Sequence, residues 1–336
     1  EPSNRDRHEG LVRSGAGSAA WTGLADRAAP PSSMGFVHAS PSGLMFDMIY
    51  DALIAPFTEF EFMRRALAAV IALALGGAPI GVFLMLRRMS LVGDAMAHAI
   101  LPGAAIGFLV SGLNLFAMTF GGLVAGFSVA LLAGLVSRVT EIKEDASLAT
   151  FYLVSLALGV TIVSMRGTNI DLLHVLFGNI LAMDDQTLLV IAFNATITLI
   201  ALAVIYRPLV IECVDPLYLR TVSRAGAPAH LAFLALVVIN LVNGFHALGT
   251  LLAVGLMVLP AGIARFWSRD ITGMIGIAVL SAAISGYCGL VLSFLTKVPS
   301  GPAIILVAAA IYIVSVLFGN VGGIVRQVFP GRHLEA

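Results

Sequence analysis

Long apolar runs constrain this chain most, because they recur along its length and each is long enough to cross a bilayer. A helix of about 20 predominantly apolar residues spans the hydrocarbon core. Only 11% of the 336 residues are charged and 59% are hydrophobic, whereas soluble domains carry about 25% charged residues. We therefore expect an all-α, polytopic integral membrane protein with the lipid bilayer as its surroundings. The formal net charge of zero gives no reason to expect a nucleic-acid partner.

The apolar runs divide into eight or nine predicted transmembrane helices. The expected spans are Phe62–Leu86, Leu91–Val110, Leu115–Val136, Leu148–Met165, Leu188–Tyr206, two short spans within His230–Phe266, Ile271–Leu295 and Ala303–Phe318. The split of His230–Phe266 is expected at its polar and glycine positions, Asn240, Asn243, Gly244 and His246. Segment 167–186 is too polar for a span, so it is either an outer loop or a re-entrant piece lining a cavity.

The flanking segments divide the chain into three parts. Residues 1–40 are expected to be a disordered tail or tag, residues 41–322 the transmembrane domain, and residues 323–336 a cytoplasmic C-terminal tail. Within the second part, residues 44–60 have the composition of an amphipathic helix at the membrane surface. An out-to-in first span places eleven Lys and Arg residues in the cytoplasm and four outside, which is the usual bias.

Asp94 and His98 are the leading candidate site. They stand four residues apart in the second predicted span, so they share one face of a helix. A carboxylate and an imidazole suit a divalent transition metal, and ionisable groups within spans usually face a protein interior or an ion path. Pro102 and Gly103 follow and allow a helix break in that path. The alternative is structural, with Asp94 stabilising a helix N-terminus and His98 hydrogen-bonded.

The other candidate residues carry weaker signals. His174 and His246 are possible auxiliary metal ligands, although a solvated or hydrogen-bonded histidine is the commoner case. Cys213 and Cys288 lie in different segments and predict neither a disulfide nor a zinc site. The polar loop expected over Arg207–Pro228 contains Asp215 and Pro216 as a helix start and Gly226 as a helix stop.

The chain has no phosphate-binding loop for ATP. Its two lysines, Lys143 and Lys297, do not stand in the G-x-x-x-x-G-K-[ST] pattern. We therefore expect no ATPase activity in this chain and no permanently bound cofactor. The energy for any transport must come from an ion gradient or from a separate subunit.

The stretch Arg87–Gly103, Arg-Arg-Met-Ser-Leu-Val-Gly-Asp-Ala-Met-Ala-His-Ala-Ile-Leu-Pro-Gly, closely resembles a signature of zinc- and manganese-type ABC importer permeases. Weaker likenesses follow in order at 176–181, 258–261 and 299–302, so the resemblance extends from about Met45 to Gly319. It implies a fold similar to that of the vitamin B12 importer. It also implies that Asp94 and His98 contact the transported Zn²⁺ or Mn²⁺, and it gives His246 no role.

The same resemblance implies the partners and the location. These are a second copy of the chain, two cytoplasmic ATP-binding cassette subunits and an extracytoplasmic metal-binding protein, in a bacterial plasma membrane with the C-terminus in the cytoplasm. A short cytoplasmic helix with Asp215, Arg220, Val222 and Gly226 would dock on the ATPase; from spacing alone, an ordinary connecting loop is also plausible. Two other function classes stay open: a gradient-driven secondary cation transporter with Asp94 and His98 as a relay, and a non-transporting membrane scaffold.

Overall fold

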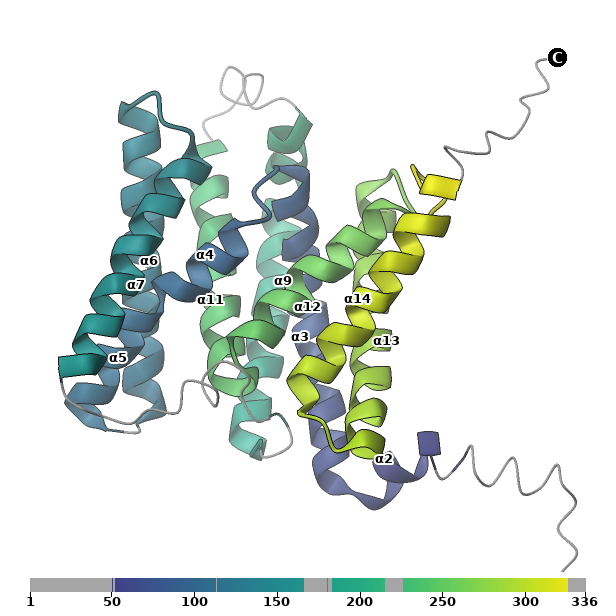
Figure 1. Cartoon of the computed structure of the whole chain (residues 1–336). Helices are drawn as coiled ribbons and strands as arrows, with labels where there is room; N and C mark the ends of the chain where they lie inside the picture. The colour runs from purple at the N-terminus through teal and green to yellow at the C-terminus, as the bar shows by residue number, and fades with distance from the viewer. Residues whose placement is uncertain are drawn as a thin grey trace, which may run out of the picture. The chain divides into compact units, whose positions relative to one another are not determined.

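The structure is a computed structural model, and it describes residues 50, 52–112, 114–165, 180, 183–214 and 226–325. The predicted tail at residues 1–40 and most of the predicted C-terminal tail, residues 326–336, lie outside the described residues. All the helices belong to one unit of the chain, residues 49–336. Within the described ranges every regular element is a helix, which confirms the all-α prediction (Figure 1).

The described helices match the predicted spans closely. In chain order they are α2 (Ala55–Glu59), α3 (Glu61–Leu86), α4 (Val92–Ala99), α5 (Leu101–Ser111), α6 (Leu115–Val139), α7 (Glu144–Met165), α9 (Asp185–Val214), α11 (Gly226–Leu248), α12 (Thr250–Arg265), α13 (Ile271–Thr296) and α14 (Ser300–Phe318). Eight segments are long and apolar enough to cross a membrane, with α4 and α5 together forming one of them. Helix α12 has 16 residues and is a ninth, shorter apolar segment of the described chain.

Helix α3 lies at the centre of the unit. It packs against α9, α12 and α13 (Figure 1), and its buried residues include Val70, Leu73 and Phe83. In α7 and α14, by contrast, only a minority of the residues are buried in a single chain. Apolar surface that faces outward is what a bilayer or a neighbouring subunit would cover.

Close helix approach depends on glycine at the crossing points. A Cβ on Gly81 would lie 1.8 Å from the Met257 carbonyl oxygen of α12. A Cβ on Gly103 in α5 would lie 2.0 Å from the Gly121 carbonyl oxygen of α6. The two pairs of backbones can come this near only because glycine has no side chain. Close approach of this kind is the usual role of small residues between membrane helices.

The predicted break near Asn240–His246 is wrong in position. Helix α11 continues through these residues to Leu248, and the chain breaks at Gly249, where φ is +82°. Buried Asn240 is tolerated because its amide donates to Thr198 Oγ1 at 2.7 Å and to the Leu236 carbonyl at 2.9 Å. Its Oδ1 accepts from Asn194 Nδ2 at 3.2 Å. Polar side chains with such partners do not interrupt a buried helix.

The loop predicted over Arg207–Pro228 is shorter than expected. Helix α9 continues past Tyr206 through Pro208 to Val214, and α11 already begins at Gly226. Gly226, predicted to stop a helix, is therefore the first residue of one. The extension of α9 is held by tertiary contacts, since Leu209 is fully buried and Glu212 pairs with Arg87. A local polarity pattern carries no trace of these contacts.

The surface helix predicted over residues 44–60 is described only from residue 50. Its regular part is α2, which packs beside α3. Phe57 stacks on Tyr287 of α13 with ring centroids 5.0 Å apart, and the Tyr287 hydroxyl donates to the Leu53 carbonyl at 2.8 Å. The segment is therefore anchored to the transmembrane helices through aromatic contacts.

Candidate functional site

Helix α4 presents Asp94 and His98 on its open face. Their i, i+4 spacing brings His98 Nε2 to 3.8 Å from Asp94 Oδ1. The two side chains are 63% and 32% exposed, while Val92, Met96 and Ala99 on the opposite face are buried in the core. The predicted shared face is confirmed. Burial of the apolar face on α7, α11 and α12 leaves the two candidate ligands facing outward from the chain.

The separation of the two side chains suits a bridging ion better than a direct hydrogen bond. A distance of 3.8 Å is too long for an N–H···O bond. Two metal–ligand bonds of about 2.1 Å each can join donor atoms up to about 4.2 Å apart. One divalent cation can therefore contact Asp94 Oδ1 and His98 Nε2 with little change in either rotamer.

Neighbouring helices hold the His98 ring in place. Tyr152 of α7 stacks on it, with centroids 6.3 Å apart and planes 29° from parallel. His98 Nδ1 is buried and forms no hydrogen bond within the described part of the chain. Beside Asp94, a Cβ on Gly93 would lie 2.6 Å from Met257 Cε, so glycine there lets α12 pack against the site.

The helix does break where Pro102 and Gly103 predicted. Helix α4 ends at Ala99 and α5 begins at Leu101, with Ile100 between them. Proline at position 102 has no N–H to donate to the His98 carbonyl, and its ring disfavours a continuous helix before it. Ser155 Oγ donates to the Ala99 carbonyl at 2.9 Å, which satisfies one acceptor at the break. The break thus follows directly after the candidate ligand His98.

Most of the remaining candidate residues lie outside the described part of the chain. Among the described residues no group of three or more His, Cys, Asp or Glu side chains could hold a metal ion. His174, Asp215, Arg220 and Val222 lie outside the described residues. His246 belongs to α11, but its side chain lies outside the described part.

Sequence reasoning missed the residues that support the site. Tyr152 and Ser155 come from α7, more than 50 positions from His98 in the chain, and no local motif marks them. Met257 belongs to an apolar run of α12 in which nothing in the sequence distinguishes it from its neighbours. A contact across helices leaves no signal in one sequence, so only the packing identifies these three.

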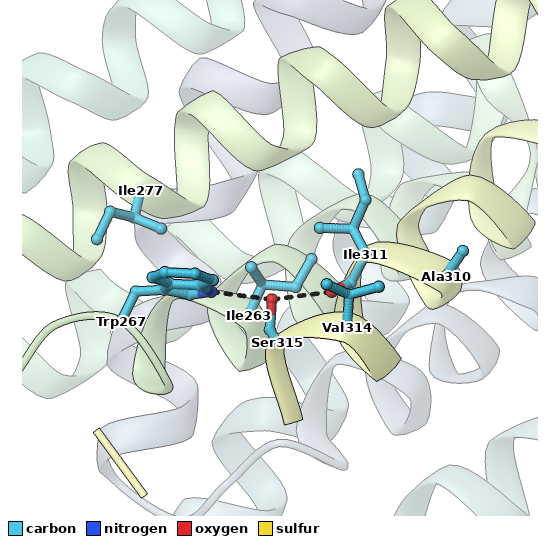
Figure 2. A pocket seen from close by; sticks show the side chains of 7 residues that line it. All are labelled: Ile263, Trp267, Ile277, Ala310, Ile311, Val314 and Ser315. Carbon is cyan, nitrogen blue, oxygen red and sulfur yellow. Dashed lines mark hydrogen bonds between the residues drawn. The ribbon is translucent and has the colours of Figure 1, made fainter. Parts of the chain in front are cut away.

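An apolar pocket elsewhere in the unit is unsuited to an ion. It has a volume of about 480 Å³ and lies among α12, α13 and α14, lined by Ile263, Trp267, Ile277, Ala310, Ile311, Val314 and Ser315 (Figure 2). Its two polar side chains are committed to each other and to backbone: Trp267 Nε1 donates to Ser315 Oγ at 2.9 Å, and that hydroxyl donates to the Ile311 carbonyl at 2.8 Å (Figure 2). The pocket offers no ionisable ligand, so the Asp94–His98 face remains the candidate site.

Sequence comparison finds relatives that match most of the chain. The chain is 30% identical over 278 residues to a manganese transport system membrane protein of Halalkalibacterium halodurans, covering 82% of this chain and 94% of that protein. It is 29% identical over 257 residues to a manganese import system permease protein of Streptococcus parasanguinis, covering 76% and 90% of the two chains.

Among solved structures, PsaBC from Streptococcus pneumoniae in complex with Fab superposes with a TM-score of 0.73 at 27% identity. The match covers 84% of this chain and all of that one. The model of the ABC 3 transport family matches residues 59–319, which include all the described helices from α3 to α14. This match includes the Asp94–His98 helix and the break after it, and the chain belongs to the ABC 3 transport family.

Proposed function

We propose that this permease carries a divalent transition metal into the cytoplasm and that Asp94 and His98 contact the ion in transit. The observation that carries the proposal is the pair itself: a carboxylate and an imidazole 3.8 Å apart, on the open face of a helix otherwise packed in apolar surroundings. Ionisable groups in such a segment are costly unless they face a path or a partner. A transport site also needs few ligands, because the ion must leave again.

Manganese is the first candidate for the transported ion, and zinc the second. Two relatives that match most of the chain are named as manganese transport proteins. An imidazole and a carboxylate suit both ions, and the general affinity order favours zinc over manganese at such ligands. Selection of manganese would therefore depend on geometry and on delivery rather than on ligand type.

The site is completed by a second copy of the chain. One chain offers two ligands among its described residues, whereas structural zinc sites use four. A two-fold axis beside α4 would bring two Asp94 and two His98 side chains together. Leu91, one turn before Asp94, is 69% exposed in the single chain and would be covered in this arrangement.

The energy comes from separate subunits. Membership of an ABC transport family implies ATP-binding cassette subunits and an extracytoplasmic binding protein, in a bacterial plasma membrane. We assign the docking of the ATPase to the segment Asp215–Gly226, which joins α9 to α11. Asp215 followed by Pro216 is typical of a helix start, which supports a short helix of this kind.

Removal of either ligand tests the proposal. Asp94→Asn and His98→Ala should each reduce ATP-dependent uptake of radioactive Mn²⁺ into proteoliposomes containing the full complex. We expect a loss of about tenfold or more, because even the loss of a residue that supports a metal ligand costs about 10- to 100-fold. Asp270→Asn is the matched control, since Asp270 is an exposed carboxylate before α13 with no capping bond from its side chain.

Folding is checked separately by the yield of monodisperse complex in detergent. Near-normal uptake in both variants would refute the assignment and leave Asp94 and His98 as a structural pair. Uptake that proceeds with an ion gradient and without ATP would instead favour a secondary transporter.

A further inference from the structure

A buried ionic cluster lies where α3 leads into α4. Arg87 is the C-cap residue of α3, and its side chain is only 7% exposed. Its Nη2 donates to Glu212 Oε2 of α9, and its Nη1 lies 2.8 Å from His230 Nδ1 of α11. The guanidinium also lies over the Phe233 ring, 4.9 Å from its centroid. One side chain therefore contacts two other helices at the end of α3.

Both terminal nitrogens of Arg87 face acceptors in this cluster, whereas its buried Nε forms no hydrogen bond within the described residues. Arginine has no acceptor, so His230 Nδ1 must accept the bond from Arg87. His230 Nδ1 also lies 3.5 Å from Glu212 Oε1, and the side chains of Glu212 and His230 are 19% and 13% exposed. Charge-assisted bonds with so little solvent are strong and directional. Removal of one partner leaves the other charge poorly compensated, so the three side chains act as a unit.

The cluster spans both ends of the proposed ATPase-docking segment. Glu212 lies two residues before the end of α9, and His230 lies four residues after the start of α11. The segment between these helices is 215–225. Any shift of either helix end relative to α3 must stretch or break a contact with Arg87.

Arg87 also adjoins the helix that carries the proposed metal ligands. A tight turn separates it from α4: Arg88 has φ of +60°, Arg88 N–H donates to the Met85 carbonyl, and Met89 N–H donates to the Leu84 carbonyl at 2.9 Å. Val92 then begins α4, and Asp94 stands in its first turn. This short hydrogen-bonded turn makes α4 follow movements of the end of α3.

We propose that Arg87, held by Glu212 and His230, is the positioning residue that connects the docking segment to the Asp94–His98 helix. A displacement of the α9 and α11 ends pulls on the guanidinium and shifts the α3–α4 turn. This inference rests on the proposed function, because it requires the segment after α9 to contact an ATPase. It adds a specific set of contacts between the proposed docking segment and the ion path, and contiguous contact networks of this kind can carry coupling between sites.

Glu212→Gln in the complete complex tests the inference. The substitution keeps the size of the side chain and removes its charge. We expect the number of ATP molecules hydrolysed per Mn²⁺ transported to rise about 2- to 30-fold, the range corresponding to coupling energies of residues within such networks. The measurement compares phosphate release with uptake of radioactive Mn²⁺ in the same proteoliposomes.

Glu61→Gln is the matched control. Glu61 also pairs with an arginine, Arg65 at 2.8 Å, but this pair is exposed and lies in the first turn of α3, at the opposite end from Arg87. Its ratio of ATP to ion should stay at the wild-type value. Glu212→Asp, which restores the charge on a shorter side chain, should recover part of the coupling.

Two results would overturn the inference. One is a proportional fall of ATP hydrolysis and uptake in Glu212→Gln, which would indicate a purely structural role. The other is an equal change of the ratio in Glu61→Gln. If Glu212→Gln does not assemble, His230→Phe provides the same measurement, because it keeps an aromatic ring and removes the acceptor for Arg87.

Failure of the proposed function gives a different pattern. In that case Asp94→Asn and His98→Ala would transport normally, whatever the ratio in Glu212→Gln. Normal coupling in Glu212→Gln with loss of uptake in the Asp94 and His98 variants would refute the connecting role alone.

Discussion

At the scale of single residues, a group of buried polar side chains between α9 and α11 is bonded internally. Asn194, Asn240 and Thr198 satisfy one another between α9 and α11. Arg87 is buried but paired. Asp94 and His98 differ, since they lie too far apart to bond each other and face outward. That contrast is the strongest residue-level reason to propose Asp94 and His98 as ion ligands rather than as residues that stabilise the fold.

Asp184, just before α9, allows a pH-dependent test of helix capping outside the membrane. Its Oδ1 accepts from the Thr187 hydroxyl and from the Thr187 N–H at 3.1 Å, and these bonds hold the pKa of the carboxyl below its usual value. A lowered pKa in the folded state means that the stabilisation is present above the unfolded-state pKa. It is lost as the pH falls through the folded-state pKa.

Asp184→Ala should therefore lower the melting temperature of the detergent-solubilised protein most at neutral pH. The difference from the wild type should shrink as the pH falls below about 4, where the free carboxyl of aspartate takes up its proton. Melting curves at a series of pH values measure both effects. If the difference in melting temperature between the wild type and Asp184→Ala stayed constant at every pH, the Asp184 carboxylate would not cap α9.

At the scale of helices, small residues determine how closely the elements pack. The α5–α6 crossing is a tight example, because Gly103 and Gly121 face each other. Since α5 continues from the break after His98, this crossing also fixes the helix that follows the candidate site. Packing of this kind places the site without contributing any ligand to it.

Gly121→Ala should destabilise the protein, because its Cβ would lie 2.1 Å from the Gly103 carbonyl oxygen. Overpacking of a tight contact costs about 1–3 kcal/mol. Gly134→Ala in the same helix is the control: nothing lies within 4 Å of its Cβ, and alanine should stabilise the helix by up to about 1 kcal/mol. Unfolding in detergent compares the two. Equal stabilities would mean that α5 and α6 do not approach at Gly121.

At the scale of the whole molecule, the proposed two-fold arrangement makes a single chain one half of the site. The described helices supply two candidate ligands, and Leu91 beside them is 69% exposed. As a member of an ABC transport family the chain acts with other subunits, and it needs no ATP-binding residues of its own. The open face of α4 therefore predicts a second copy of the chain across a two-fold axis.

A cysteine at Leu91 should form a disulfide with its copy, because Leu91 lies one turn before Asp94 on the exposed side of α4. The experiment uses a background in which the free Cys213 and Cys288 are replaced by alanine. Leu280→Cys on α13 is the comparison, since Leu280 is 60% exposed on a different helix. Oxidation followed by non-reducing electrophoresis detects the dimer. Cross-linking at Leu280 with none at Leu91 would contradict the proposed axis.

The sequence alone was sufficient for the features that depend on local composition. Apolar runs predict where most spans lie, since the bilayer sets their length, and Pro102 predicts the helix break because its missing N–H acts locally. The i, i+4 spacing likewise puts Asp94 and His98 on one face of the helix, because the helical period alone decides it.

Tertiary structure decided what depends on distant partners. Asn240 stays within a continuous helix because Thr198 and Asn194 satisfy its amide, and α9 extends beyond Tyr206 because Leu209 and Glu212 pack against other helices. Tyr152 at His98 and the Arg87–Glu212–His230 cluster join segments more than 50 residues apart. Their energies come from contacts between helices, so no pattern along one segment could reveal them.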